Sequence, residues 1–111
     1  MDFWQRLDSL LAGHTIVLDR PKGSHHPRYP EIVYPLDYGY LKDTSAADGN
    51  GIDIWRGSLS GNHLVGVVCT VDSFKQDAEI KLLIDCTSQE RDIINGFYNG
   101  SHSMSGLLVK R

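Results

Sequence analysis

The chain has 111 residues, of which 41% are hydrophobic and 23% are charged, and its formal net charge is −3. This length suffices for a single domain, residues 1–111, but not for a second core. The acidic balance argues against nucleic acid as a partner, because binding to phosphate backbones needs a basic excess.

The N-terminal stretch predicts an amphipathic helix over residues 2–12. Its apolar residues recur at helical spacing, Asp2 can serve as the cap, and Gly13 follows the end. Short segments rich in branched and aromatic residues then predict five strands, at 15–19, 31–36, 52–57, 63–71 and 79–85. Such spacing is typical of a small barrel or sandwich.

Turn and cap signals complete the expected order of elements. The pair Gly61 and Asn62 predicts one hairpin, and the polar stretch 72–78 predicts another. Thr87 and Glu90 form a capping box for a second helix, and Gly100 is its stop. The tail, residues 100–111, begins as a flexible Gly/Ser segment, and we expect its end to lie on the body of the domain.

The sequence indicates the cellular compartment and the oligomeric state of the protein less closely than its fold. No apolar run reaches membrane-spanning length, and the chain opens without the basic and apolar regions of a signal peptide. We therefore expect a cytoplasmic protein with no membrane partner, in which Cys69 and Cys86 are reduced thiols packed in the sheet. Trp4 and Trp55 suit either the core or a subunit contact, which leaves a homo-oligomer possible.

Two groups of acidic residues are candidates for a metal site. Asp48 and Asp53 flank glycines that permit a tight loop, and carboxylates are ligands that hard divalent cations prefer. An ordinary turn leading into a strand explains this loop equally well. Asp77, Glu79 and Lys81 alternate, so on a strand they share one face, where they could hold cations and a phosphate oxygen or form a solvated ion pair.

A basic stretch between Asp19 and Tyr29 could bind an anion. It contains Arg20, Lys22 and Arg28, and Arg28 is the preferred candidate because guanidinium reads phosphate through a planar fork. His25 and His26 do not indicate zinc, because no Cys or third His lies at ligand spacing. A solvent-exposed turn is the alternative for the whole stretch.

One gapless stretch resembles the motif of the soluble family I inorganic pyrophosphatases. In that family Tyr-Pro-x-Asn-Tyr-Gly-Tyr is followed by Thr and then by Asp-Gly-Asp-x-x-Asp. The matching positions here are Tyr34, Pro35, Tyr38, Gly39, Tyr40, Thr44, Asp48, Gly49 and Asp53. The resemblance, closest to the short bacterial members, covers residues 15 to 99. It implies a five-stranded OB-like barrel with the two helices packed outside, and magnesium-dependent hydrolysis of pyrophosphate to two phosphates.

The resemblance also implies roles for individual residues. Metal ligands would be Asp48, Asp53, Asp77, Glu79 and Asp19, with Asp72 as an alternative to Asp77. Phosphate-binding groups would be Tyr38, Lys81, Arg28 and Tyr98, to which the basic stretch itself adds Lys22. Tyr38, Lys81 and the residue at position 50 would form the catalytic set.

Asn50 departs from the family pattern, which has at this place an aspartate thought to accept a proton from the attacking water. An amide is not such a base, so the loss predicts a slow enzyme. A non-catalytic phosphate- or metal-binding relative and a hydrolase of another phosphoanhydride, such as a nucleotide, remain alternatives. An OB-type oligonucleotide binder is the least favoured, because of the acidic balance.

Overall fold

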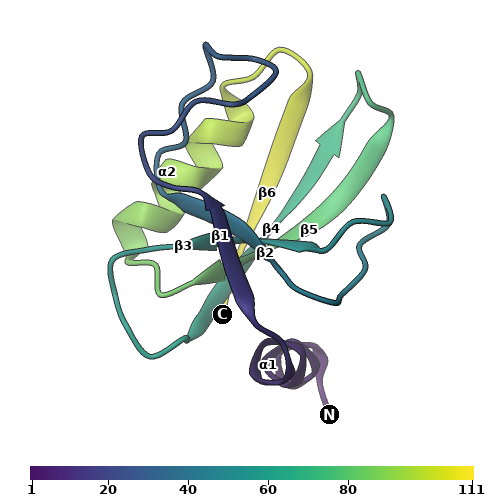
Figure 1. The fold of residues 1–111 in the computed structure, drawn as a ribbon, viewed down its shortest axis with the longest axis vertical. Coiled ribbons are helices and arrows are strands. Elements are labelled where there is room, and N and C mark those ends of the chain that lie inside the picture. Colours follow the sequence, from purple (N-terminus) through teal and green to yellow (C-terminus); the bar gives the residue numbers. More distant parts are fainter.

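Six strands form one sheet in the order β1-β2-β3-β5-β4-β6; in sequence, one helix precedes all the strands and the other lies between β5 and β6 (Figure 1). The computed structural model describes all residues, 1–111. Its elements are α1 (Phe3–Gly13), β1 (Ile16–Arg20), β2 (Asp37–Leu41), β3 (Ile52–Arg56), β4 (Leu64–Asp72), β5 (Asp77–Ile84), α2 (Ser88–Asn99) and β6 (Met104–Lys110).

The mainly β class with two helices is confirmed, but the sheet has six strands rather than five. Neighbouring strands are antiparallel except for β3 and β5, which run parallel. The edge strands β1 and β6 do not pair with each other, so the sheet is not a closed barrel. Neither α1 nor α2 is long and apolar enough to cross a membrane.

Strand alternation divides the core into two clusters on opposite faces of the sheet. Ile54 and Leu82 face α1, where Leu11 is buried with them. Trp55 and Leu83 point the other way and pack with Ile94 of α2. Each face is therefore covered by a different helix. By the same alternation, Asp53 and Lys81, which precede Ile54 and Leu82, point to the face that carries Trp55.

Both predicted helices are confirmed together with their N-terminal caps, but α1 includes Gly13, which was expected to follow its end, and its C-cap is His14. Asp2 accepts from the backbone of Gln5, and Thr87 accepts from the backbone of Glu90, each within a complete capping box. Gly100 is the C-cap of α2. These signals are local in sequence, which is why the sequence alone specifies them.

The strand predicted at 31–36 is wrong. The strand of this region is β2, which begins only at Asp37. Pro30 and Pro35 cannot donate backbone hydrogen bonds, so the preceding segment is an irregular loop whose β-pairing is limited to one isolated bridge between His25 and Val33. In β2, Gly39 is required by close packing, because a Cβ there would lie 1.8 Å from the carbonyl oxygen of Val17.

The hairpin predicted at Gly61 and Asn62 is also wrong, whereas the one at 72–78 is confirmed as the β4–β5 hairpin. β3 and β4 do not pair, because β5 lies between them. The connecting segment instead crosses the end of β5, where the Asp85 carboxylate accepts from the backbone of Asn62 and His63. A turn signal in the sequence does not reveal which strands it joins.

The tail predicted to lie on the body forms a full strand, β6, antiparallel to β4. Cys69 of β4 and Cys86 after β5 are both free thiols, as expected. Burial raises the pKa of the Cys86 thiol to about 12, so this group is neutral at physiological pH.

Glu90 provides a test of how the loop after β3 is attached to α2. Its carboxylate accepts from the backbone of Ser58 at 3.0 Å and from that of Thr87 at 2.9 Å. Burial opposes ionisation, but these hydrogen bonds outweigh it and lower the pKa of Glu90. A carboxyl group with a lowered pKa stabilises the fold above its unfolded-state pKa, and the contribution is lost as the pH falls through the folded value.

We expect Glu90→Ala to lower the free energy of unfolding by about 1 kcal/mol at pH 7. The difference from the unsubstituted protein should shrink below pH 4, in urea titrations at several pH values. Asp92→Ala removes an exposed carboxylate from the same helix and is the matched control. An equal loss in both variants, or a loss independent of pH, would contradict this attachment.

Candidate active site

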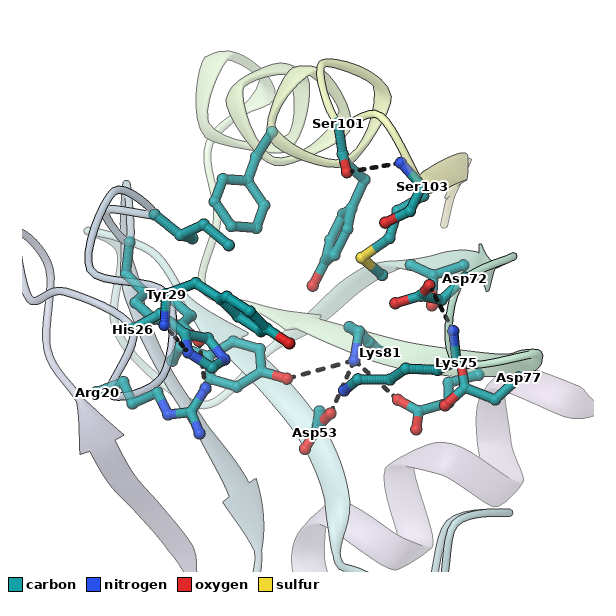
Figure 2. A pocket seen from close by; sticks show the side chains of 18 of the residues that line it. Arg20, His26, Tyr29, Asp53, Asp72, Lys75, Asp77, Lys81, Ser101 and Ser103 are labelled. Atoms are coloured by element: carbon teal, nitrogen blue, oxygen red, sulfur yellow. Dashed lines mark hydrogen bonds and ion pairs between the residues drawn. The ribbon is translucent and has the colours of Figure 1, made fainter.

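A cavity of about 1320 Å³ opens between the irregular loop 21–36, the β4–β5 hairpin and the C-terminal end of α2. Its floor is the face of the sheet that also carries Trp55. Figure 2 shows side chains from these segments converging on the cavity around Lys81. Residues far apart in the sequence are thus brought to one place.

Strand pairing explains why the polar side chains meet there. Tyr38 pairs with Trp55, and Tyr40 pairs with Asp53, so the alternate residues of β2 and β3 face the cavity together. β5 lies parallel to β3 on its other side. Its residues Asp77, Glu79 and Lys81 all line the cavity, as their predicted alternation requires.

Lys81 lies at the centre of the cluster and is 6% exposed. Its ammonium group donates to Asp53 Oδ2 at 2.8 Å, to Glu79 Oε2 at 2.9 Å and to the Tyr38 hydroxyl at 3.3 Å (Figure 2). Burial disfavours its charge, but the anionic and polar groups around it, including Tyr98, outweigh burial and raise the pKa of Lys81. Lys81 therefore stays protonated and acts as a fixed positive charge.

The two tyrosines beside Lys81 are hydrogen-bond donors and acceptors rather than bases. Burial raises the pKa of Tyr38 and that of Tyr98, so both hydroxyl groups stay protonated at neutral pH. The Tyr98 oxygen accepts a hydrogen bond from Trp55 Nε1 at 3.0 Å, which fixes its position. A phosphate oxygen close to Lys81 would find these hydroxyl groups available as donors.

The loop 42–51 brings a further carboxylate to the cluster. Thr44 closes this loop, since its hydroxyl donates to the carbonyl of Leu41 and accepts from the backbone of Ile52. The Asn50 N–H donates to Asp48 Oδ1 at 3.0 Å and is the main cause of the lowered pKa of Asp48. Glu79 lines the same cavity, and burial raises its pKa.

The charges of the lining are unbalanced toward the negative. Three side chains with a fixed positive charge face seven carboxyl groups. The carboxyl groups are those of Asp19, Glu31, Asp48, Asp53, Asp72, Asp77 and Glu79. A polyanion such as a phosphoanhydride would be repelled by this excess unless cations entered with it.

The donor chemistry suits a hard divalent cation. All the negative donors of the lining are carboxylate oxygens, those of Asp48, Asp53 and Glu79 among them. No three His, Cys, Asp or Glu side chains form a ready-made chelating cluster. Magnesium is usually held by one or two carboxylates, waters and substrate phosphates rather than by an all-protein cage, so this arrangement is compatible with it.

Most of the side chains predicted for the site line the cavity, and two do not. Those that line it are Asp19, Tyr38, Asp48, Asn50, Asp53, Asp77, Glu79, Lys81 and Tyr98. Lys22 and Arg28 lie on the exposed loop outside the lining. Their predicted role in binding phosphate is therefore not supported by their position.

Asp72 and Asp77 are partners across the β4–β5 hairpin, and both line the cavity. Asp72 already accepts hydrogen bonds from the backbone of Phe74 and Lys75, through Oδ1. Asp77 has no such task in the turn, which favours it as the more available carboxylate of the pair.

Two basic residues of the cavity, Arg20 and Lys75, were not predicted for the site. The Arg20 guanidinium lies 5.4 Å from the ring centroid of Tyr34 and donates to its hydroxyl group. Lys75 extends from the hairpin turn into the cavity (Figure 2). The basic stretch in the sequence includes Arg20, but no local feature distinguishes it from Arg28 as the phosphate-binding residue. A lysine in a turn, such as Lys75, is not indicated as a site residue by the sequence around it.

No known protein-family model matches the chain. Over 60 residues it is 33% identical to the inorganic pyrophosphatases of Geobacillus stearothermophilus and Bacillus sp. (strain PS3). That match takes in 47% of this chain and 36% of each relative, so the chain spans little more than a third of the relatives that it matches.

Solved structures extend the likeness to the fold. An inorganic pyrophosphatase from Helicobacter pylori aligns with a TM-score of 0.64 and 17% identity, covering 86% of this chain and 83% of that one. One from Coxiella burnetii gives a TM-score of 0.63 at 13% identity, with the same coverage. The resemblance to inorganic pyrophosphatases is confirmed. At these identities the solved structures show a shared fold, and the chemistry has to be argued from the site.

The buried charge of Lys81 leads to a prediction about stability. In the absence of divalent cations, Lys81→Met should lower the free energy of unfolding by about 2–4 kcal/mol, because Asp53 and Glu79 are left as close, partly buried carboxylates without a counter-charge. Urea titration at neutral pH measures the loss. Lys42→Met, at an exposed position outside the cavity, is the control and should change stability by less than about 0.5 kcal/mol. Equal effects would contradict the central role of Lys81.

Proposed function

We propose that this chain hydrolyses inorganic pyrophosphate to two phosphates with the help of magnesium ions. The observation that carries the proposal is the buried ammonium group of Lys81, hydrogen-bonded to Asp53 and Glu79 in a cavity that carries an excess of carboxylates. A phosphoanhydride needs both kinds of group: basic groups for its oxygens, and carboxylates for the cations that neutralise it.

The carboxylates that would hold magnesium are Asp48, Asp53, Asp77 and Glu79, with Asp19 on the β1 side of the cavity. Bound magnesium supplies charge neutralisation and lowers the pKa of a bound water. Lys81, with Tyr38 beside it, would donate hydrogen bonds to phosphate oxygens. Tyr98 of α2 would hold the same phosphate.

Arg20 and Lys75 are better placed than Lys22 and Arg28 to hold the second phosphate, because only the former pair lines the cavity. Arginine in particular presents a planar fork of donors to phosphate. The low cysteine count and the free thiols support a cytoplasmic setting for the reaction.

Asn50 limits the rate in this proposal. Its side chain lines the cavity and can orient a water by hydrogen bonding, but an amide does not take up the proton of that water at neutral pH. A positioned base typically contributes about 100-fold to 10,000-fold in rate, so slow turnover is expected. The same departure favours a second candidate, a relative that binds magnesium and a phosphate ligand without turnover.

Phosphate release from pyrophosphate, with magnesium and with a chelator, tests the proposal. The protein should release phosphate only with magnesium, Asp53→Asn should abolish the release, and Asn50→Asp should raise kcat by about 100-fold or more. Asp92→Asn, on the exposed face of α2, is the control for contaminating activity and for the loss of an acid. Background release in all four proteins would overturn hydrolysis and leave the binding relative as the function.

A further inference from the structure

The cavity has an apolar end, and inorganic pyrophosphate has no apolar group that could pack against it. Tyr29 and Val33 of the loop 21–36 line this end while remaining 37% and 44% exposed, and Phe74 of the hairpin, 79% exposed, lines the opposite wall. They are not part of either core cluster. Exposed apolar groups gathered along one cavity are typical of a ligand site rather than of packing.

We propose that the substrate of this site is a nucleoside diphosphate, in which one phosphate of the pyrophosphate group is esterified and the base lies against the apolar end. The inference rests on the proposed hydrolysis of a phosphoanhydride and names its substrate class. Pyrophosphate has nine non-hydrogen atoms and is small for a cavity of about 1320 Å³. Pockets of roughly 300–1,000 Å³ already accommodate drug-sized molecules.

The basic and apolar ends are joined by one row of aromatic side chains. Tyr38 is hydrogen-bonded to Lys81, and its ring lies 5.2 Å from that of Tyr34. The ring of Tyr34 is stacked with that of His26 at 6.3 Å, and His26 lies 5.2 Å from Tyr29. The row therefore leads continuously from the phosphate-binding ammonium group to the exposed ring at the rim.

Arg20 lies where the two ends meet. Its guanidinium is 5.4 Å from the ring centroid of Tyr34 and 5.9 Å from that of Tyr38, and it also lines the cavity. The esterified phosphate of a nucleoside diphosphate would pass this group, with the terminal phosphate nearer Lys81. Figure 2 shows Arg20, His26 and Tyr29 together on the side of the cavity away from Asp72 and Asp77.

The organic group is a flat base rather than an alkyl chain because of the side chains that surround it. Tyr29 and His26 offer ring faces, and base–aromatic stacking contributes about 1–3 kcal/mol per base. Burial and the charge of Arg20 lower the pKa of His26, so its ring is neutral at physiological pH and does not carry a cation into the stack.

The reaction is the same hydrolysis with one organic substituent. The oxygen of a water molecule bonds to the terminal phosphorus, the anhydride bond between that phosphorus and the bridging oxygen breaks, and the bridging oxygen keeps the electron pair. The products are inorganic phosphate, a nucleoside monophosphate and one proton.

The experiment compares phosphate release from adenosine diphosphate and from pyrophosphate, each with magnesium, as kcat/KM. The unsubstituted protein should hydrolyse both, and Tyr29→Ser should lower the ratio of the two kcat/KM values, adenosine diphosphate over pyrophosphate, by about tenfold, mainly through KM. Phe74→Ser is a second variant on the opposite wall. Leu107→Ser removes an exposed apolar side chain outside the cavity and should leave the ratio unchanged.

Three results would overturn the inference. Release from pyrophosphate alone refutes the nucleotide and leaves the proposed hydrolysis standing, as does a ratio that neither cavity variant changes. Release from neither substrate refutes the proposed hydrolysis and, with it, the substrate class.

Discussion

The candidate site depends on one interaction, the buried positive charge of Lys81 among Asp53, Glu79 and Tyr38. Without that charge, two carboxylates on neighbouring strands would lie close together with little solvent to screen them, which costs free energy. With it, both carboxylates have a counter-charge at hydrogen-bonding distance, beside a cavity that is still rich in carboxyl groups. The Lys81 charge thus allows Asp53 and Glu79 to lie at one end of the same cavity lining.

The parallel pairing of β3 with β5 makes this interaction possible. Asp53 and Lys81 belong to segments separated by the whole of β4, yet Ile54 and Leu82, the residues that follow them, are directly paired. The inserted β5 also forces the chain after β3 to cross its end, where Asp85 and Glu90 hold the crossing segment. The stability of the crossing and the geometry of the site therefore share one cause.

Features with a local cause could be predicted from the sequence. The capping boxes and the shared face of Asp77, Glu79 and Lys81 depend only on residues a few positions apart. Features decided by distant partners could not. The insertion of β5 between β3 and β4 and the choice of Arg20 over Arg28 at the cavity both depend on the path of the sheet, which the local pattern does not contain.

Binding of imidodiphosphate, a non-hydrolysable analogue of pyrophosphate, tests the central claim without requiring turnover. The cavity has seven carboxyl groups and three fixed positive charges, so the account predicts that magnesium and the analogue bind together. Calorimetric titration should give an affinity for the analogue at least tenfold higher with magnesium than with a chelator. An affinity that is the same in both conditions would contradict the account, because the carboxylates would then have no part in holding the ligand.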